Sequence, residues 1–134
     1  MNDAFLPLRA PCPPGTCDCD RDRLLETPGA DLRALRLTRM EEKRLLERLE
    51  QLRDLDDLHH MQQRLFDLLG VRLHLGPGHN EVRSMRGLDI RLEPMPGLCR
   101  KVRQSVPAAI RRALEQRPEI AWRLLDAHDL LRDA

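Results

Sequence analysis

The sequence predicts a mostly helical α+β fold, in which two helical hairpins surround a small antiparallel β-hairpin and follow an irregular N-terminal segment rich in Cys and Pro. Aromatic residues make up 2% of the chain and charged residues 34%, so leucine has to fill most of the core, which is typical of packed amphipathic helices. Long stretches repeat leucine at helical spacing, and two short runs between them alternate apolar and polar residues as half-buried strands do.

Two regions differ in composition. Residues 1–30 form the irregular Cys/Pro-rich segment, with little helical periodicity apart from a turn near residues 23–25, and residues 31–134 form a single α+β domain. The first region cannot build a core by itself. It is therefore either a metal-binding loop held against the domain or a mobile tail.

The domain begins with residues 34–37, whose alternation predicts a short strand. Thr38 and Glu41 then form a capping box, in which each side chain accepts the other's backbone N–H, so a helix should begin near Arg39 and end near Arg53. Its expected apolar face consists of Leu45, Leu46, Leu49 and Leu52.

A second helix should follow directly and pack against the first as an antiparallel hairpin. Asp54 or Asp56 can cap its start, and Gly70 can end it in the left-handed conformation. The stripe expected to be buried consists of Leu58, Met61, Leu65, Leu68 and Leu69.

Residues 71–75 and 88–92 alternate and predict the β-hairpin. Ser105 is expected to cap the third helix, with Pro107 in its first turn, and Pro118 to open the fourth. The side chains expected to point inward from these two helices are Ile110, Ala113, Leu114, Ile120, Leu124, Ala127 and Leu131, with Trp122 and Leu125 flanking the last helix.

The N-terminus carries Asp3 and Pro7 where a signal peptide would have cations and an apolar stretch, and no apolar run approaches the length of a membrane span. We therefore expect a cytoplasmic protein without membrane association. Thiols in that compartment are usually reduced, which leaves metal binding, catalysis or simple burial as roles for the cysteines.

The strongest chemical signal is the group Cys12, Cys17, Cys19 and Cys99. Cysteines separated by one to four residues reach one metal centre only if the backbone between them turns tightly, and Gly15 supplies that freedom. The two prolines before it stiffen the loop and reduce the entropy lost on metal binding. The sequence thus predicts a tetrathiolate site, with Arg21, Arg23, Arg100 and Lys101 near enough in sequence to offset its negative charge.

Residues 12–17 resemble the cluster loop of plant-type [2Fe–2S] ferredoxins, where two cysteines four residues apart enclose a glycine followed by a small hydroxyl residue. The resemblance is local: the next cysteine follows after one residue rather than two, and the family's β-grasp fold does not match this helix-rich pattern. It implies a [2Fe–2S] centre on the four cysteines.

Other interpretations of the cysteines stay open. Zinc is expected about as strongly as the [2Fe–2S] cluster, and Cu(I), which soft thiolates also bind, comes third. Alternatively, Cys99 is a small core residue and the other three cysteines are tail thiols with no ligand.

The second candidate site is a region rich in arginine between residues 82 and 117. The whole chain has a formal net charge of only +1, so anion binding would need such a local surface. The candidate anion- or partner-binding residues are Arg83, Arg86, Arg100, Lys101, Arg103, Arg111 and Arg112. They could contact nucleic-acid phosphates or an acidic protein, although this stretch has no aromatic residue on which bases could stack.

Common enzyme motifs are missing from the sequence: it has no phosphate-binding glycine loop, no nucleophile elbow and no dinucleotide fingerprint. We therefore expect a non-catalytic protein. The leading hypothesis is a small metal- or iron–sulfur-binding accessory or electron-transfer protein that docks on a partner protein. The alternative is an interaction module that binds nucleic acid or an acidic protein through the arginine-rich region, with structural or idle cysteines.

Overall fold

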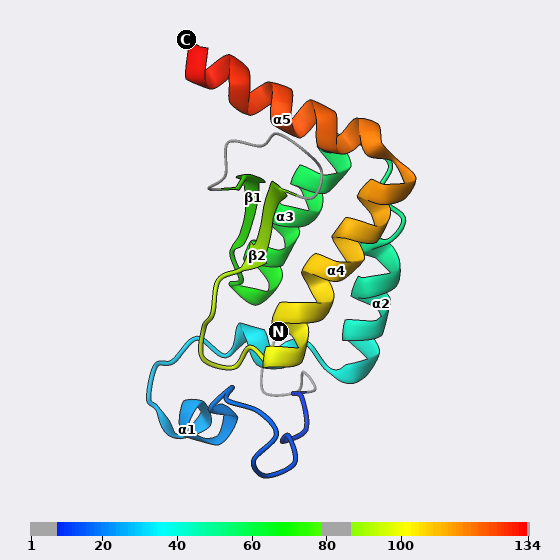
Figure 1. Cartoon of the computed structure of the whole chain (residues 1–134). Helices are drawn as coiled ribbons and strands as arrows, with labels where there is room; N and C mark the ends of the chain where they lie inside the picture. Colours follow the sequence, from blue (N-terminus) through cyan, green and yellow to red (C-terminus); the bar gives the residue numbers. More distant parts are fainter. Residues whose placement is uncertain (1–7, 79–86, 134) are drawn as a thin grey trace.

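A computed structural model describes residues 8–78 and 87–133 and confirms the mostly helical α+β fold (Figure 1). The elements are α1 (Arg21–Glu26), a 3-10 helix η2 (Arg33–Arg36), α2 (Arg39–Leu49), α3 (Leu55–Leu69), β1 (Leu73–Pro77), β2 (Leu88–Leu92), α4 (Arg100–Gln116) and α5 (Pro118–Asp133). Of the helices that the structure describes in these residues, none is long and apolar enough to cross a membrane.

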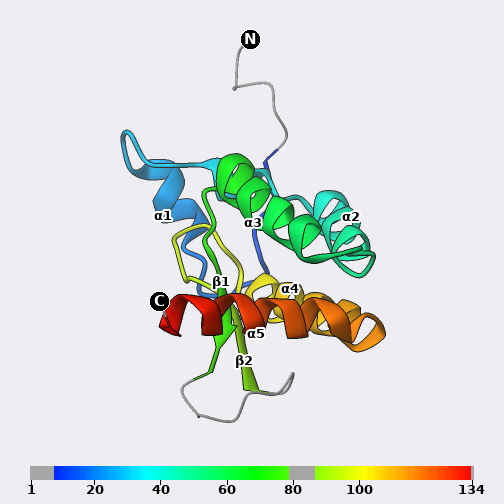
Figure 2. The same cartoon turned by 90° about the horizontal axis from the view of Figure 1, so that it is seen from above.

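The β-hairpin lies among the helices. Its strands pair antiparallel, with Leu73 opposite Leu92 and Leu75 opposite Ile90. Helix α4 contacts β2 on one side and α2 on the other, while α5 contacts β1, α3 and α4 and crosses one end of the molecule (Figures 1 and 2). The largest fully buried side chains are Leu35, Leu49, Leu52, Leu58, Val71, Val106, Ile110, Leu114 and Ile120, so leucine does dominate the core.

The helix boundaries around the first hairpin follow local signals. The Thr38 hydroxyl accepts the N–H of Glu41, and the Asp54 carboxylate accepts the N–H of Asp57 at 2.7 Å. Gly70 ends α3 with φ of 74°. The predicted capping box forms only in part, because the N–H of Thr38 donates to the Arg36 carbonyl instead of to the Glu41 side chain.

Two predictions for the part of the chain before α3 were wrong. Residues 34–37 do not form a strand: the 3-10 helix η2 buries Leu35 completely, and the Leu35 carbonyl accepts a bond from Arg9 rather than from a neighbouring strand. Helix α2 ends at Leu49 instead of near Arg53, because the chain turns there and packs Leu52 fully into the core from the connection.

Helix α4 begins earlier than the predicted cap at Ser105. Cys99 is its N-cap residue, and the Cys99 carbonyl accepts N–H groups from the first turn at 3.1 Å. The additional turns bury Val102, which lies one helical repeat before the buried Val106. Their burial outweighs the hydrogen bond that Pro107, inside the helix, cannot donate.

The predicted buried stripes were partly wrong. Leu68 in α3 is 52% exposed, and Leu45 and Leu46 in α2 are only half-buried. In α5, Leu125 is buried rather than flanking, whereas Trp122 is exposed. The other predicted inward positions up to Leu124 are buried, Ala127 is half-buried, and the side chain of Leu131 lies outside the described residues.

Residues 8–20 lie against the start of α4 and against η2 (Figure 1). The N–H of Arg9 donates to the Leu35 carbonyl, and the N–H of Gly97 donates to the Cys19 carbonyl, both at 2.7 Å. These bonds bring the Cys/Pro-rich segment to the end of the domain where Cys99 precedes α4.

Candidate metal centre

A tight turn folds the cysteine loop back on itself. The Thr16 N–H and hydroxyl both donate to the Pro13 carbonyl, at 3.2 and 2.6 Å. Gly15, at the third position of this turn, has φ of 78°, which is why the sequence needs glycine after proline there. The turn directs Cys12 and Cys17 toward the same point.

All four cysteine sulfurs meet at that point. Every pair of Sγ atoms lies within 4.8 Å, with Cys12 3.5 Å from Cys99 and 4.0 Å from Cys19. Cys19 and Cys99 are buried, whereas Cys12 and Cys17 are half-buried. The structure therefore brings together the four residues that the sequence predicted as ligands, and the group could hold a metal ion.

The centre sits at the N-terminus of a long helix. Cys99 directly precedes α4, whose aligned peptide dipoles stabilise negative charge at this end. Burial raises the pKa of Cys17, but hydrogen bonds from the backbone N–H groups of Arg100 and Cys19 outweigh it and bring the pKa down to about 7. The first turn of α4 thus stabilises a thiolate directly.

The thiols of Cys99 and Cys12 show the opposite tendency. Burial raises the pKa of Cys99, and the hydrogen bond with Cys12 raises it further, above its ordinary range. Burial also raises the pKa of Cys12. These two sulfurs keep their protons unless a cation replaces them, and metal ions do this when they bind cysteine.

Arg9 provides a positive charge inside the structure. The residue is only 8% exposed, and its guanidinium donates to the Gly97 carbonyl at 2.6 Å and to Cys19 Sγ at 3.1 Å. No carboxylate pairs with it among the described residues, and its Nε is buried without a partner. Since a buried charge is costly without an opposite one, Arg9 is placed to offset negative charge in the cysteine group.

An ion pair connects the cysteine loop to α4 from outside. Arg103 donates to both oxygens of Asp18, at 2.8 and 3.0 Å. This hydrogen bond lowers the pKa of the Asp18 carboxyl below its ordinary value. The acid between Cys17 and Cys19 is thus neutralised by α4 and adds little negative charge to the sulfurs.

The sequence did not indicate Arg9 as a cation near the sulfurs, and it favoured other cations, among them Arg21 and Arg23. Arg21 instead donates to the Arg9 carbonyl at 2.8 Å and pairs with Asp22, so it supports the loop backbone rather than the sulfurs. Arg23 is exposed. No periodicity connects Arg9 with Cys19, because their contact arises from the irregular path of the loop, so the sequence held no signal for it.

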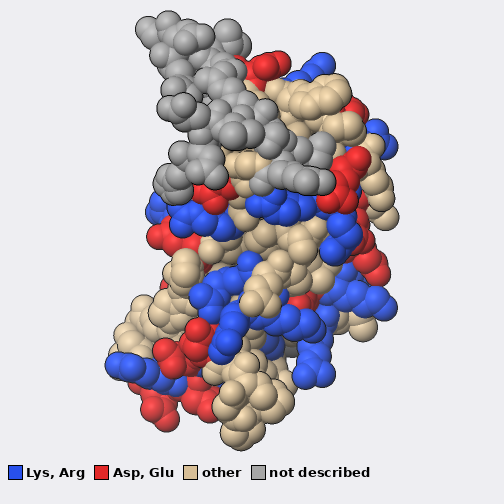
Figure 3. Space-filling model, viewed as in Figure 1, with Lys and Arg blue, Asp and Glu red and all other residues tan. Residues whose placement is uncertain are grey.

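The fold places the cationic residues of the arginine-rich region in different environments. Arg83 and Arg86 lie outside the described residues. Arg103 is bound to Asp18, Arg111 donates to the Leu88 carbonyl at 2.8 Å, and Arg112 pairs with Glu50. Arg100 and Lys101 are exposed, and cationic side chains spread over the face where β2 and α4 lie (Figure 3).

Comparison of the chain with protein-family models, with curated proteins and with solved structures found no match. The function is therefore inferred from the geometry of the chain itself.

Proposed function

We propose that the four cysteines bind one zinc ion as a structural tetrathiolate, and that the protein is a non-catalytic accessory domain that acts by docking on a partner protein. The observation that carries the zinc assignment is the close approach of all four sulfurs, none more than 4.8 Å from another. The metal would join the Cys/Pro-rich segment to the start of α4.

Sulfur separations favour a single metal over a two-iron cluster. With zinc–sulfur bonds of about 2.3 Å, a tetrahedral site has sulfurs about 3.8 Å apart. The separations of Cys12 from Cys99 and Cys19, 3.5 and 4.0 Å, bracket that value. A [2Fe–2S] cluster instead holds its cysteines as pairs on two irons, so that sulfurs on different irons are separated by roughly 6 Å. The electron-transfer hypothesis, which needs such a cluster, has less support.

The charge of the site favours zinc over Cu(I), and the number of ligands favours a structural zinc site. Four thiolates around Zn²⁺ leave about two negative charges, and around Cu(I) about three. The buried guanidinium of Arg9 and the N-terminus of α4 can offset the smaller excess. Four protein ligands also close the coordination sphere, which is typical of structural rather than catalytic zinc. The cytoplasmic location that the sequence predicts would keep the thiols reduced.

Elemental analysis tests the assignment. The full chain, purified anaerobically without a metal-affinity tag, should contain one zinc per chain and no acid-labile sulfide. Cys19→Ser should lose the zinc, whereas Ala10→Ser, which adds the same hydroxyl at an exposed position of the same segment, should keep it. If the protein contains iron and an equal amount of sulfide, the site holds an iron–sulfur cluster and the zinc assignment is wrong. If it contains no stoichiometric metal, the proposal of a metal site is wrong.

A second candidate function has one favourable observation. Arg100 and Lys101 are exposed in the first turn of α4, and neither forms an ion pair with an acid in the described part of the chain. A nucleic acid or an acidic protein could approach them. Binding of labelled duplex DNA should then fall steeply with salt, and replacing both residues by serine should reduce the salt dependence. Absence of binding at about 50 mM salt would exclude the nucleic-acid form of this function.

A further inference from the structure

The first helical hairpin leaves part of its apolar surface uncovered. Leu49 is the single buried residue within α2, although Leu45 and Leu46 lie on the same apolar face. On the facing helix, α3, Leu68 belongs to the apolar stripe but is 52% exposed. The two helices therefore present an apolar seam that the described part of the chain does not fill.

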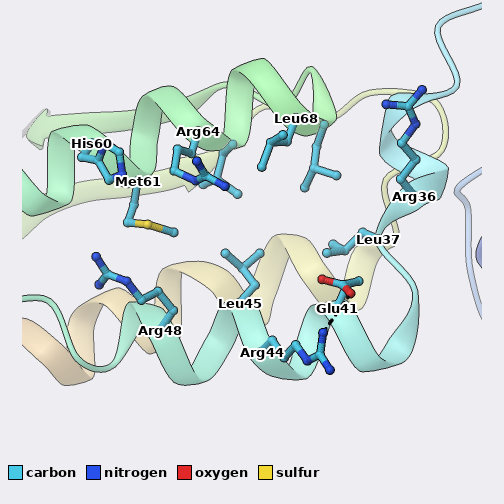
Figure 4. Close-up of a pocket in the computed structure, with 12 residues that line it drawn as sticks. Arg36, Leu37, Glu41, Arg44, Leu45, Arg48, His60, Met61, Arg64 and Leu68 are labelled. Carbon is cyan, nitrogen blue, oxygen red and sulfur yellow. Dashed lines mark hydrogen bonds and ion pairs between the residues drawn. The ribbon is translucent and has the colours of Figure 1, made fainter. Parts of the chain in front are cut away.

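This seam is a groove of about 560 Å³ between α2 and α3 (Figure 4). The side chains that form its apolar floor are Leu37, Leu45, Met61, Leu65, Leu68 and Leu69. Along α3 its lining residues extend from His60 to Leu69, which is about 14 Å or between two and three helical turns. The groove thus has the length of a short helical segment.

Cationic side chains line both sides of the groove. In Figure 4, Arg48 lies toward one end and Arg36 at the other, with Arg44 and Arg64 between them on opposite helices. Glu41 is the one acid among the lining residues, and it pairs with Arg44 at 3.4 Å. The charge around the apolar floor is therefore predominantly positive.

Two of these arginines differ in how they are held. Arg48 makes a two-pronged ion pair with the buried Asp57, with bonds of 2.5 and 3.1 Å, which positions its guanidinium. Arg64 is exposed and has no ion pair among the described residues. An anionic partner would therefore find at Arg64 a cation that no acid of the described chain neutralises.

We propose that this groove binds an acidic amphipathic helix of a partner protein, with leucine-like side chains on the floor and Glu or Asp on both flanks. Helices bind in this way through apolar anchors spaced three and four residues apart. A single-chain amphiphile with one anionic head would need its cations at one end, whereas here they follow the full length of the groove. The inference rests on the docking role in the proposed function and not on the metal.

A synthetic peptide provides the probe. It has about 18 residues, long enough to form a helix on binding, with Leu at helical spacing and Glu on the flanks. A matched peptide carries Lys in place of Glu. Fluorescence anisotropy with the metal-loaded full chain should show saturable binding of the Glu peptide that weakens with salt, and at least about tenfold weaker binding of the Lys peptide.

Variants locate the binding site. Arg64→Glu and Leu68→Gln should each weaken binding of the Glu peptide by about tenfold. The matched controls Arg123→Glu and Trp122→Gln change exposed residues of α5, outside the groove, and should leave the dissociation constant unchanged. Circular dichroism and zinc content should stay those of the wild type in all four variants, because none of these residues touches the sulfurs.

Several results would overturn the inference: no saturable binding of the Glu peptide, equal binding of both peptides, or binding that Arg64→Glu and Leu68→Gln leave unchanged. Sedimentation that shows a dimer lost in Leu68→Gln would assign the groove to a second copy of this chain instead. The metal is judged separately. If the wild type contains no zinc but still binds the Glu peptide, the metal proposal is wrong and the groove proposal stands. If the wild type contains zinc but does not bind the Glu peptide, the groove proposal is wrong and the metal proposal stands.

Discussion

Replacing Arg9 by Met should weaken zinc binding while preserving the fold. Arg9 donates to Cys19 Sγ at 3.1 Å from a buried position, so the substitution removes a charge-assisted hydrogen bond and the main buried counter-charge of the site. Such a bond is worth about 1.5–3 kcal/mol, which corresponds to roughly 10- to 150-fold in affinity. Groups that hydrogen-bond to metal ligands typically change affinity by about 10- to 100-fold.

Competition with a chromogenic chelator measures this loss. Arg9→Lys keeps the charge but cannot reach both the Gly97 carbonyl and Cys19, so its affinity should fall between those of Arg9→Met and the wild type. Arg23→Met removes an exposed arginine close in sequence and should have no effect. If Arg9→Met binds zinc within about twofold of the wild type, the guanidinium does not stabilise the bound thiolates and the reasoning is wrong.

Three further predictions concern stability. Asp57→Asn should cost about 2 kcal/mol in urea unfolding, a value reduced because Arg48 is partly exposed, whereas the exposed Asp56→Asn should cost little. The hydrogen bond from Arg48 lowers the pKa of Asp57 in the folded protein. The Asp57 carboxylate should therefore contribute its full free energy of stabilisation above about pH 4, and this contribution should be lost as the pH falls through the pKa of Asp57 in the folded state. If the wild type exceeds Asp57→Asn in stability by the same amount at about pH 2 as at neutral pH, the prediction is contradicted. Gly97→Ala should lower the thermal midpoint more than Gly29→Ala, because both have positive φ but only at Gly97 would a Cβ lie 2.9 Å from a leucine side chain; equal losses would contradict this. Removing the metal with a chelator should speed tryptic cleavage within residues 8–30, and an unchanged cleavage rate would show that the metal does not hold that segment.

Local signals accounted for most of the fold. The Thr38 and Asp54 caps and the left-handed Gly70 act within one turn of chain, so their residue types alone predict where α2 and α3 begin and where α3 ends. Alternation likewise predicted the β-hairpin and the bounds of β2, but β1 begins at Leu73 instead of residue 71 and continues through Pro77. Errors arose where contacts with distant residues set a boundary, as when burial of Val102 extended α4 to before Ser105 and left Pro107 inside the helix.

The candidate site shows the same division. The spacing of Cys12, Cys17 and Cys19 and the turn at Gly15 marked three ligands locally, but the approach of Cys99 depends on how the segment packs against α4. Arg9 was missed for that reason. Exposure of Leu68 was also unpredictable, because helical spacing shows which face of α3 is apolar but not how much of that face its neighbours cover.

X-ray absorption at the zinc edge tests the central claim most directly, because it reports the number and distance of the atoms bound to the metal in the full chain. We predict four sulfur neighbours at about 2.3 Å and no nitrogen or oxygen neighbour. Fewer than four sulfurs, or an iron absorption edge with a second iron close by, would contradict a mononuclear zinc site formed by Cys12, Cys17, Cys19 and Cys99.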